Sequence, residues 1–171
     1  MSDKLFTRLL NDIRVDLADE FDRNFERKAF FDEPWPGEKI PNRKGSLMAR
    51  KNHLRRSINS RVSGMNIIFE SHAVYANIHN NGGKIRVSGK MKKFFWAMYY
   101  KNGGGQKKGK TNRTAEMWKA MALKPVGSII EIPQRQFIGT HAKVHQSIER
   151  AGSYFLRDIE DYLNQIFKKH K

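Results

Sequence analysis

The sequence predicts an α+β fold in which a small antiparallel sheet carries long N-terminal and C-terminal helices packed on it. Two observations lead to this prediction: both ends of the chain are long amphipathic stretches, and several short β-prone runs lie between them. Such helices have apolar stripes that need cover, and short strands with one buried face can provide it. With 171 residues, the chain is expected to form a single domain, 1–171.

The first amphipathic stretch predicts a helix over residues 3–28. Ser2 or Asp3 can cap its start, and Pro34 and Pro36 end any helical pattern because proline lacks an N–H. Trp35, between these prolines, is expected to anchor their loop to the body of the protein. Apolar residues recur at every fourth position along one helical face: Leu5, Leu9, Ile13, Leu17, Phe21 and Phe25.

The middle of the chain has shorter elements. We expect a short helix at 46–56, then a hairpin of strands 58–62 and 66–71 that turns at Ser63-Gly64-Met65. Residues 72–80 predict one or two helical turns, closed by glycine at 82 and 83, because glycine adopts positive φ at helix ends. A third strand is predicted at 84–88.

The last third of the chain combines an apparent insertion with a second long helix. Residues 89–126 have the composition of an insertion: a basic, aromatic-rich piece, a Gly- and Lys-rich loop at 102–110, and a helix-prone run at 114–124. A strand is predicted at 127–132. A helix is predicted over 141–170, with its apolar positions at Val144, Ile148, Ala151, Phe155, Ile159, Leu163 and Phe167.

Charge is strongly segregated along the chain, whose net charge is +16. Residues 1–38 have six basic and ten acidic side chains, whereas residues 39–124 have twenty basic and two acidic ones. Such a stretch is typical either of contact with a polyanion or of a solvated surface. In the insertion, the candidate contacts with DNA or a neighbouring protein are Lys101, Lys107, Lys108 and Lys110.

Nothing in the sequence indicates an enzyme, a metal site or a cofactor. The absence of cysteine excludes thiol catalysis and thiolate metal sites. His141 and His145 have metal-ligand spacing, but Lys143 lies between them, and helix-surface histidines are the favoured interpretation. Acidic residues in 39–124 are too few for a nuclease metal cluster. No strand is evident before the glycines at 103–105, although a phosphate-binding loop would need one. No membrane span or leader is evident, so synthesis in the cytoplasm is expected.

Three segments resemble the phage virion morphogenesis, or tail-completion, family of Mu-like and P2-like tailed phages. The first is Leu54-Arg55-Arg56-Ser57-Ile58. The second, residues 75–83, is similar to the family's Tyr-Ala-x-Ile-His-x-x-Gly pattern, and the third, residues 132–139, to its Ile-Pro-x-Arg-x-Phe-Leu-Gly pattern. The positions that carry the resemblance are Leu54, Ser57, Tyr75, Ile78, His79, Gly82, Gly83, Pro133, Arg135, Phe137 and Gly139.

The resemblance implies a structural virion protein without catalytic residues. It implies a tail-completion, tail-terminator or neck subunit that assembles as a homo-oligomer, commonly a six-fold ring, at the head–tail junction. Its expected partners are neck and tail-tube proteins, with non-specific contact to phage DNA. The motif residues themselves are expected to serve packing and turn geometry, with Phe137 as an anchor.

An alternative function is that of a free, non-enzymatic, basic nucleic-acid-binding protein. In that case aromatic residues of the insertion would stack on bases; otherwise they are buried against the domain or a neighbouring subunit. These aromatic residues are Phe94, Phe95, Trp96, Tyr99 and Tyr100.

Overall fold

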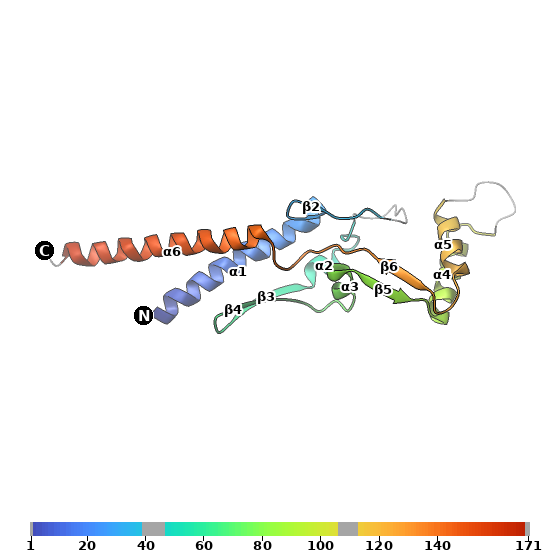
Figure 1. The fold of residues 1–171 in the computed structure, drawn as a ribbon, viewed down its shortest axis with the longest axis horizontal. Coiled ribbons are helices and arrows are strands. Elements are labelled where there is room, and N and C mark those ends of the chain that lie inside the picture. The colour runs from blue at the N-terminus through green and yellow to red at the C-terminus, as the bar shows by residue number, and fades with distance from the viewer. Residues whose placement is uncertain (1, 39–46, 106–112, 170–171) are drawn as a thin grey trace.

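The computed structural model describes residues 2–38, 47–105 and 113–169. Figure 1 shows an elongated molecule with the free ends of its first and last helices at one end and a helical hairpin at the other. The elements follow in the order α1 (Ser2–Arg27), β1 (Ala29–Phe30), β2 (Glu33–Pro34), α2 (His53–Arg56), β3 (Ile58–Ser63), β4 (Asn66–Ser71), α3 (Ala76–Asn81), β5 (Gly83–Arg86), α4 (Gly89–Lys101), α5 (Arg113–Leu123), β6 (Ile129–Ile132) and α6 (Ala142–Lys169). The predicted α+β class is confirmed.

Within the described residues the strands form three two-stranded antiparallel sheets, whereas the sequence predicted a single small sheet. The hairpin β3–β4 runs from the pair Ile58–Ser71 to the pair Ser63–Asn66. β5 does not extend this hairpin, because it pairs with the distant β6 instead. The short ladder of β1 with β2 was not predicted from the sequence.

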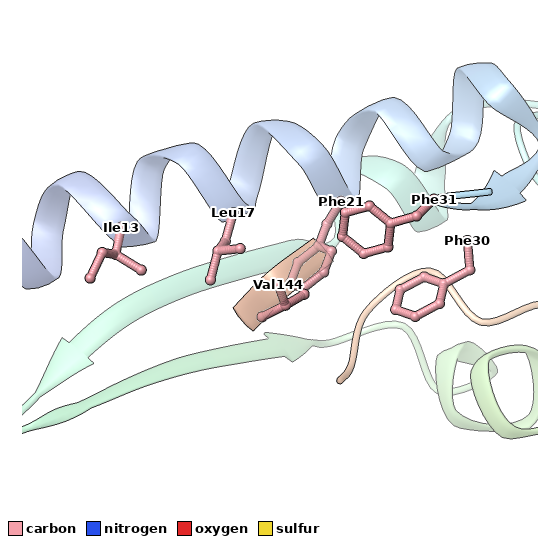
Figure 2. Close-up of a cluster of buried hydrophobic side chains, with 6 residues drawn as sticks. All are labelled: Ile13, Leu17, Phe21, Phe30, Phe31 and Val144. Atoms are coloured by element: carbon pink, nitrogen blue, oxygen red, sulfur yellow. The ribbon is translucent and has the colours of Figure 1, made fainter. Parts of the chain in front are cut away.

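The main core lies where α1, the segment after it and the start of α6 meet the β3–β4 hairpin. Figure 2 shows side chains of α1 pointing toward the hairpin, with a residue of α6 beside them. Phe21 packs edge-to-face on Phe69 of β4, with ring centroids 4.9 Å apart. The hairpin therefore covers the middle of the apolar stripe of α1, at Ile13, Leu17 and Phe21. The buried residues of this cluster are Ile13, Leu17, Phe21, Phe30, Phe31 and Val144.

The two long predicted helices are confirmed, but their apolar stripes are covered only in part. Along α1 the stripe is buried at Ile13 and beyond, whereas Leu5 in the first turns is exposed. Along α6, Val144 is buried but Leu163 and Phe167 are exposed. The reason is geometric: α1 and α6 diverge toward their free ends, where no strand lies between them (Figure 1).

The helix predicted at 46–56 is much shorter than expected. Within the described residues 47–56, only His53–Arg56 is helical, because Met48 and Asn52 have positive φ values of 62° and 55°, which interrupt a right-handed helix. The helical turns expected at 72–80 begin later, at Ala76, and end at Asn81.

The segment predicted as an insertion emerges at the ends of β5 and β6. Backbone hydrogen bonds from Val87 to Ser128 and from Gly127 to Val87, both 2.8 Å, close its base. α4 and α5 pack on each other, and Phe95 of α4 lies 6.0 Å from Trp118 of α5 between ring centroids. We call β5, β6, α4 and α5 the arm, which extends away from the long helices (Figure 1).

Candidate functional site

The three motif segments meet in one place, which we call the motif junction. It is built around a second buried cluster, in which Phe137 is completely buried and packs against Phe25 of α1, with ring centroids 5.3 Å apart. The junction therefore joins α1, the segment before β3, α3 and the segment after β6. The buried residues of the cluster are Phe25, Trp35, Leu54, Ala73, Ala76 and Phe137.

α3 is attached to the third motif segment through hydrogen bonds. The side-chain oxygen of Asn80 accepts hydrogen bonds from the backbone amides of Phe137, at 2.9 Å, and Ile138, at 3.1 Å. The carbonyl of His79 accepts a third, from the amide of Arg135, at 2.8 Å. α3 and the segment after β6 are thus held in a defined register, since three backbone amides of that segment have their partners in α3.

The other side of the third segment is attached to α1 and to the loop after it. Asn24, completely buried, donates a hydrogen bond to the carbonyl of Phe137 and accepts one from the amide of Phe31. The indole of Trp35 donates to the carbonyl of Gln136 at 2.6 Å. Trp35 thus lies where an anchor was expected, whereas Asn24 and Asn80 were missed. A polar residue three positions after Phe21 on the buried face of α1 was the available signal for Asn24.

Arg135 has a fixed position beneath the loop that contains Trp35. Its guanidinium donates to the carbonyls of Pro36 and Gly37, at 2.8 Å each. Burial lowers the pKa of Arg135, and burial together with the charge of Arg135 lowers the pKa of His79. His79 Nδ1 is buried without a hydrogen-bond partner among the described residues. The neutral imidazole is therefore the favoured form at this position.

The first motif segment is attached to both α1 and β4. Ser57 is buried; its hydroxyl donates to the carbonyl of Leu54 at 2.7 Å and lies 2.6 Å from the hydroxyl of Ser71. Arg55 forms ion pairs with Asp22 and Glu26 of α1, and the hydrogen bonds to Asp22 and Glu26 raise its pKa. The segment thus serves as a brace between the hairpin and α1.

The remaining motif positions serve turns and packing. Gly82 has a φ of 71°, and a Cβ there would lie 3.0 Å from the backbone nitrogen of Gln134, so any side chain would press on the third segment. Ile78 packs beside Gly83. Tyr75 is exposed, and its hydroxyl lies 2.8 Å from His53 Nδ1. Pro133 lines the cavity described next, and Gly139 is exposed.

A cavity of about 880 Å³ lies between the motif junction and α5. Its walls are largely apolar, with Leu47, Met117 and Met121 among them, and His79 and Arg135 on its motif side. Among the described residues no group of three or more His, Asp or Glu side chains is arranged to hold a metal ion. The cavity offers packing surface and scattered charge, and the hydrogen-bonded pair of His53 and Tyr75 also lines it.

The two histidines with metal-ligand spacing have other surroundings. His141 Nδ1 accepts a hydrogen bond from the amide of Lys143 at the start of α6, and its Nε2 lies 3.1 Å from Asp32 Oδ1. The ring stacks on Phe31 at 4.7 Å between centroids. The pKa of Asp32 is lowered, first by a hydrogen bond from its own backbone amide and then by Lys143. His141 is thus a helix cap, and His145 is exposed.

The model of the phage virion morphogenesis family matches residues 4–154 of this chain. The chain belongs to this family. The match extends from the first turns of α1 to the middle of α6 and includes all three motif segments. No curated protein and no solved structure matches the chain. The C-terminal half of α6 lies beyond the matched residues.

The surface candidates of this family member are lysine and aromatic residues of the predicted insertion. Lys101 is exposed at the end of α4, whereas Lys107, Lys108 and Lys110 lie outside the described residues. The five aromatic residues of α4 differ in exposure: Phe95 is buried, Trp96 and Tyr99 are half-buried, and Phe94 and Tyr100 are exposed at 54% and 62%. Within the described residues, no helix is both long and apolar enough to cross a membrane.

Proposed function

We propose that this virion morphogenesis protein is a tail-completion, tail-terminator or neck subunit that assembles as a ring, with six copies, at the head–tail junction. The observation that supports it best is the uncovered apolar surface of α1 and α6. Monomeric soluble proteins rarely expose large apolar patches, and those that exist usually mark interaction sites. In a virion protein, this surface supports a role in assembly.

The proposed function is structural rather than enzymatic. The motif residues are engaged in packing, turns and backbone hydrogen bonds, which are needed to build the subunit itself. Purified protein is expected to cleave neither duplex nor single-stranded DNA in the presence of Mg²⁺ or Mn²⁺. Cleavage that persists through purification and disappears with a single substitution in this chain would contradict the proposal.

Native mass spectrometry of the full chain, alone and mixed with the phage's tail-tube protein and with tails, tests the ring. We expect six copies per particle, either free or bound to the tail end. A protein that remains monomeric under all three conditions would overturn the proposal. It would favour the alternative function if the same monomer bound duplex DNA tightly at physiological salt.

The arm provides the second part of the proposal, non-specific contact with phage DNA in the channel of the ring. Its support is the concentration of basic residues in 39–124, since phosphate attraction needs no sequence recognition. Base stacking is less supported, because Phe95 is buried and pairs with Trp118. Changing Lys101, Lys107, Lys108 and Lys110 to Gln should reduce the slope of log affinity against log salt by up to about 0.9 per lost duplex phosphate contact. An unchanged slope would exclude this role for them.

A further inference from the structure

A groove between α1 and α6 is open in the single chain. Its volume is about 730 Å³, and it is lined by Lys4 to Asp16 on α1 and by Ala151 to Leu163 on α6. Figure 1 shows these two helices diverging toward their free ends. The apolar lining of the groove includes Leu5, Leu9, Phe155, Ile159 and Leu163.

This groove lacks cover from the rest of the described chain. Leu163 remains 44% exposed, and Phe167, one turn further along α6, is 68% exposed. The groove lining has three acidic residues and two basic ones, Lys4 and Arg8. Asp12 pairs with Arg8, whereas Asp16 and Asp158 form no ion pair within the described residues. A helix that brings apolar and basic side chains would find partners for both.

The outward face of α4 has this composition. Phe94 and Tyr100 are exposed, with the small Ala97 between them, and the spacing of three places all of them on one stripe. Exposed Lys90 and Lys93 lie along the same face. The inward face of α4 is already in use, since Phe95 packs on Trp118. One edge of Phe94 also contacts Trp118, with ring centroids 5.8 Å apart, but 54% of Phe94 remains exposed.

The length of α4 also matches the length of the groove. α4 has 13 residues, and the stretches of α1 and α6 that line the groove are each of the same length in residues. At a rise of about 1.5 Å per residue, each is about 20 Å long. A third helix of this length would fill the space between the two diverging helices.

We propose that α4 of one copy docks in the α1–α6 groove of the next copy, and that this contact closes the ring. The groove and the arm are at opposite ends of the elongated molecule (Figure 1), so one chain cannot fill its own groove. A contact between two different surfaces is heterologous, and it generates a ring when the rotation between copies closes. This inference rests on the proposed ring and names the surfaces that build it.

Complementation between two variants tests the contact. Leu163→Glu places a charge in the groove but leaves the arm intact, and Phe94→Glu does the reverse. Each variant alone should remain monomeric, whereas an equimolar mixture should form a one-to-one dimer through its one intact groove and one intact arm. The matched control is Leu156→Glu, because Leu156 is on α6, 62% exposed, and does not line the groove. It should assemble as the wild type does. Circular dichroism checks that all three variants keep their helices.

The absence of cysteine permits a second, direct test. Leu163→Cys and Phe94→Cys chains, mixed under mild oxidation, should give a disulfide-linked heterodimer in high yield, and Leu156→Cys with Phe94→Cys should not.

Four results would overturn the proposal. If Phe94→Glu assembles while Leu163→Glu does not, the interface is α6 on α6 or the arm faces DNA. If both single variants assemble, neither surface is used. If the wild type forms rings but the Leu163→Cys and Phe94→Cys chains do not crosslink, the docking fails while the proposed function stands. A wild type that forms no ring even on tails would remove the proposed function itself, and the docking with it.

Discussion

The side-chain oxygen of Asn80 accepts a hydrogen bond from the backbone amide of Phe137 at 2.9 Å, across 57 positions of sequence. The same oxygen also accepts one from Ile138. One amide side chain thereby joins the second and third motif segments, and it places Phe137 against α1. The motif junction depends on this contact, which leads to the first prediction.

Asn80→Ala should lower the free energy of unfolding by about 2–4 kcal/mol, because two partly buried N–H groups would lose their acceptor. Asn80→Asp keeps the acceptor oxygen and should therefore lower the free energy of unfolding by less. The control is Asn81→Ala, since Asn81 is exposed and its side chain, among the described residues, bonds to Asn77 and Asn80 of its own helix. Its effect should stay within about 0.5 kcal/mol. Urea unfolding measures all three, and equal losses for Asn80→Ala and Asn81→Ala would refute the assignment.

Phe137→Ala should lower the free energy of unfolding by about 3–5 kcal/mol, because the completely buried ring would leave a cavity beside Phe25. Phe167→Ala removes the same ring from an exposed position on α6 and should change monomer stability by less than about 0.5 kcal/mol. Denaturant unfolding of the monomer compares them. A loss below about 1 kcal/mol for Phe137→Ala would show that the ring is not an anchor.

Stability should decrease as the pH falls below about 6.5, the ordinary pKa of histidine, through the titration of His79. Burial and the charge of Arg135 lower the pKa of His79 in the folded state, so the unfolded chain binds a proton at a higher pH than the folded chain does. The contribution of His79 is thus fully present above the unfolded pKa and is lost as the pH falls through the folded one.

His79→Gln should remove this part of the pH dependence, leaving the contributions of the other histidines unchanged. Urea unfolding of both proteins at pH 7.5 and pH 5.5 gives the difference. If the substitution leaves the change in stability between these two pH values unaltered, His79 is not the group responsible.

Gly82→Ala should destabilise the protein through two effects, the positive φ of 71° and the approach of the new Cβ to within 3.0 Å of the nitrogen of Gln134. Gly64→Ala is the matched control, because Gly64 has a φ of 59° in the hairpin turn but nothing within 4 Å of an added Cβ. Gly64→Ala should lower the free energy of unfolding by only about 1 kcal/mol, the cost of the positive φ by itself. Thermal unfolding should show a larger loss for Gly82→Ala. Equal losses would show that neither the backbone of Gly82, with its φ of 71° and ψ of −179°, nor the approach to Gln134 adds to the cost.

The sequence alone determined the elements with strong periodicity. Apolar side chains four apart from Ile13 to Phe25 gave enough signal to place α1, and the turn at Gly64 was enough to place the β3–β4 hairpin, because both depend on local spacing. The motif segments could be found in the same way. The short helix at 46–56 was overestimated because the positive φ of Asn52 is a backbone state that an asparagine permits but does not require.

Tertiary structure alone decided the pairings. β5 joins β6 and not the hairpin, since partner choice depends on contacts between residues far apart in sequence, which no local pattern encodes. Asn24 and Asn80 acquired their roles in the same way: an asparagine bonds wherever a complementary backbone group arrives, and the arrival is a property of the fold. The exposure of Leu163 could not be predicted from the sequence either. An apolar stripe on a helix predicts that this face must be covered but not which surface covers it. Periodicity is a local property of the chain, whereas cover requires a second surface, and here the distance between α1 and α6 decides where that surface is missing.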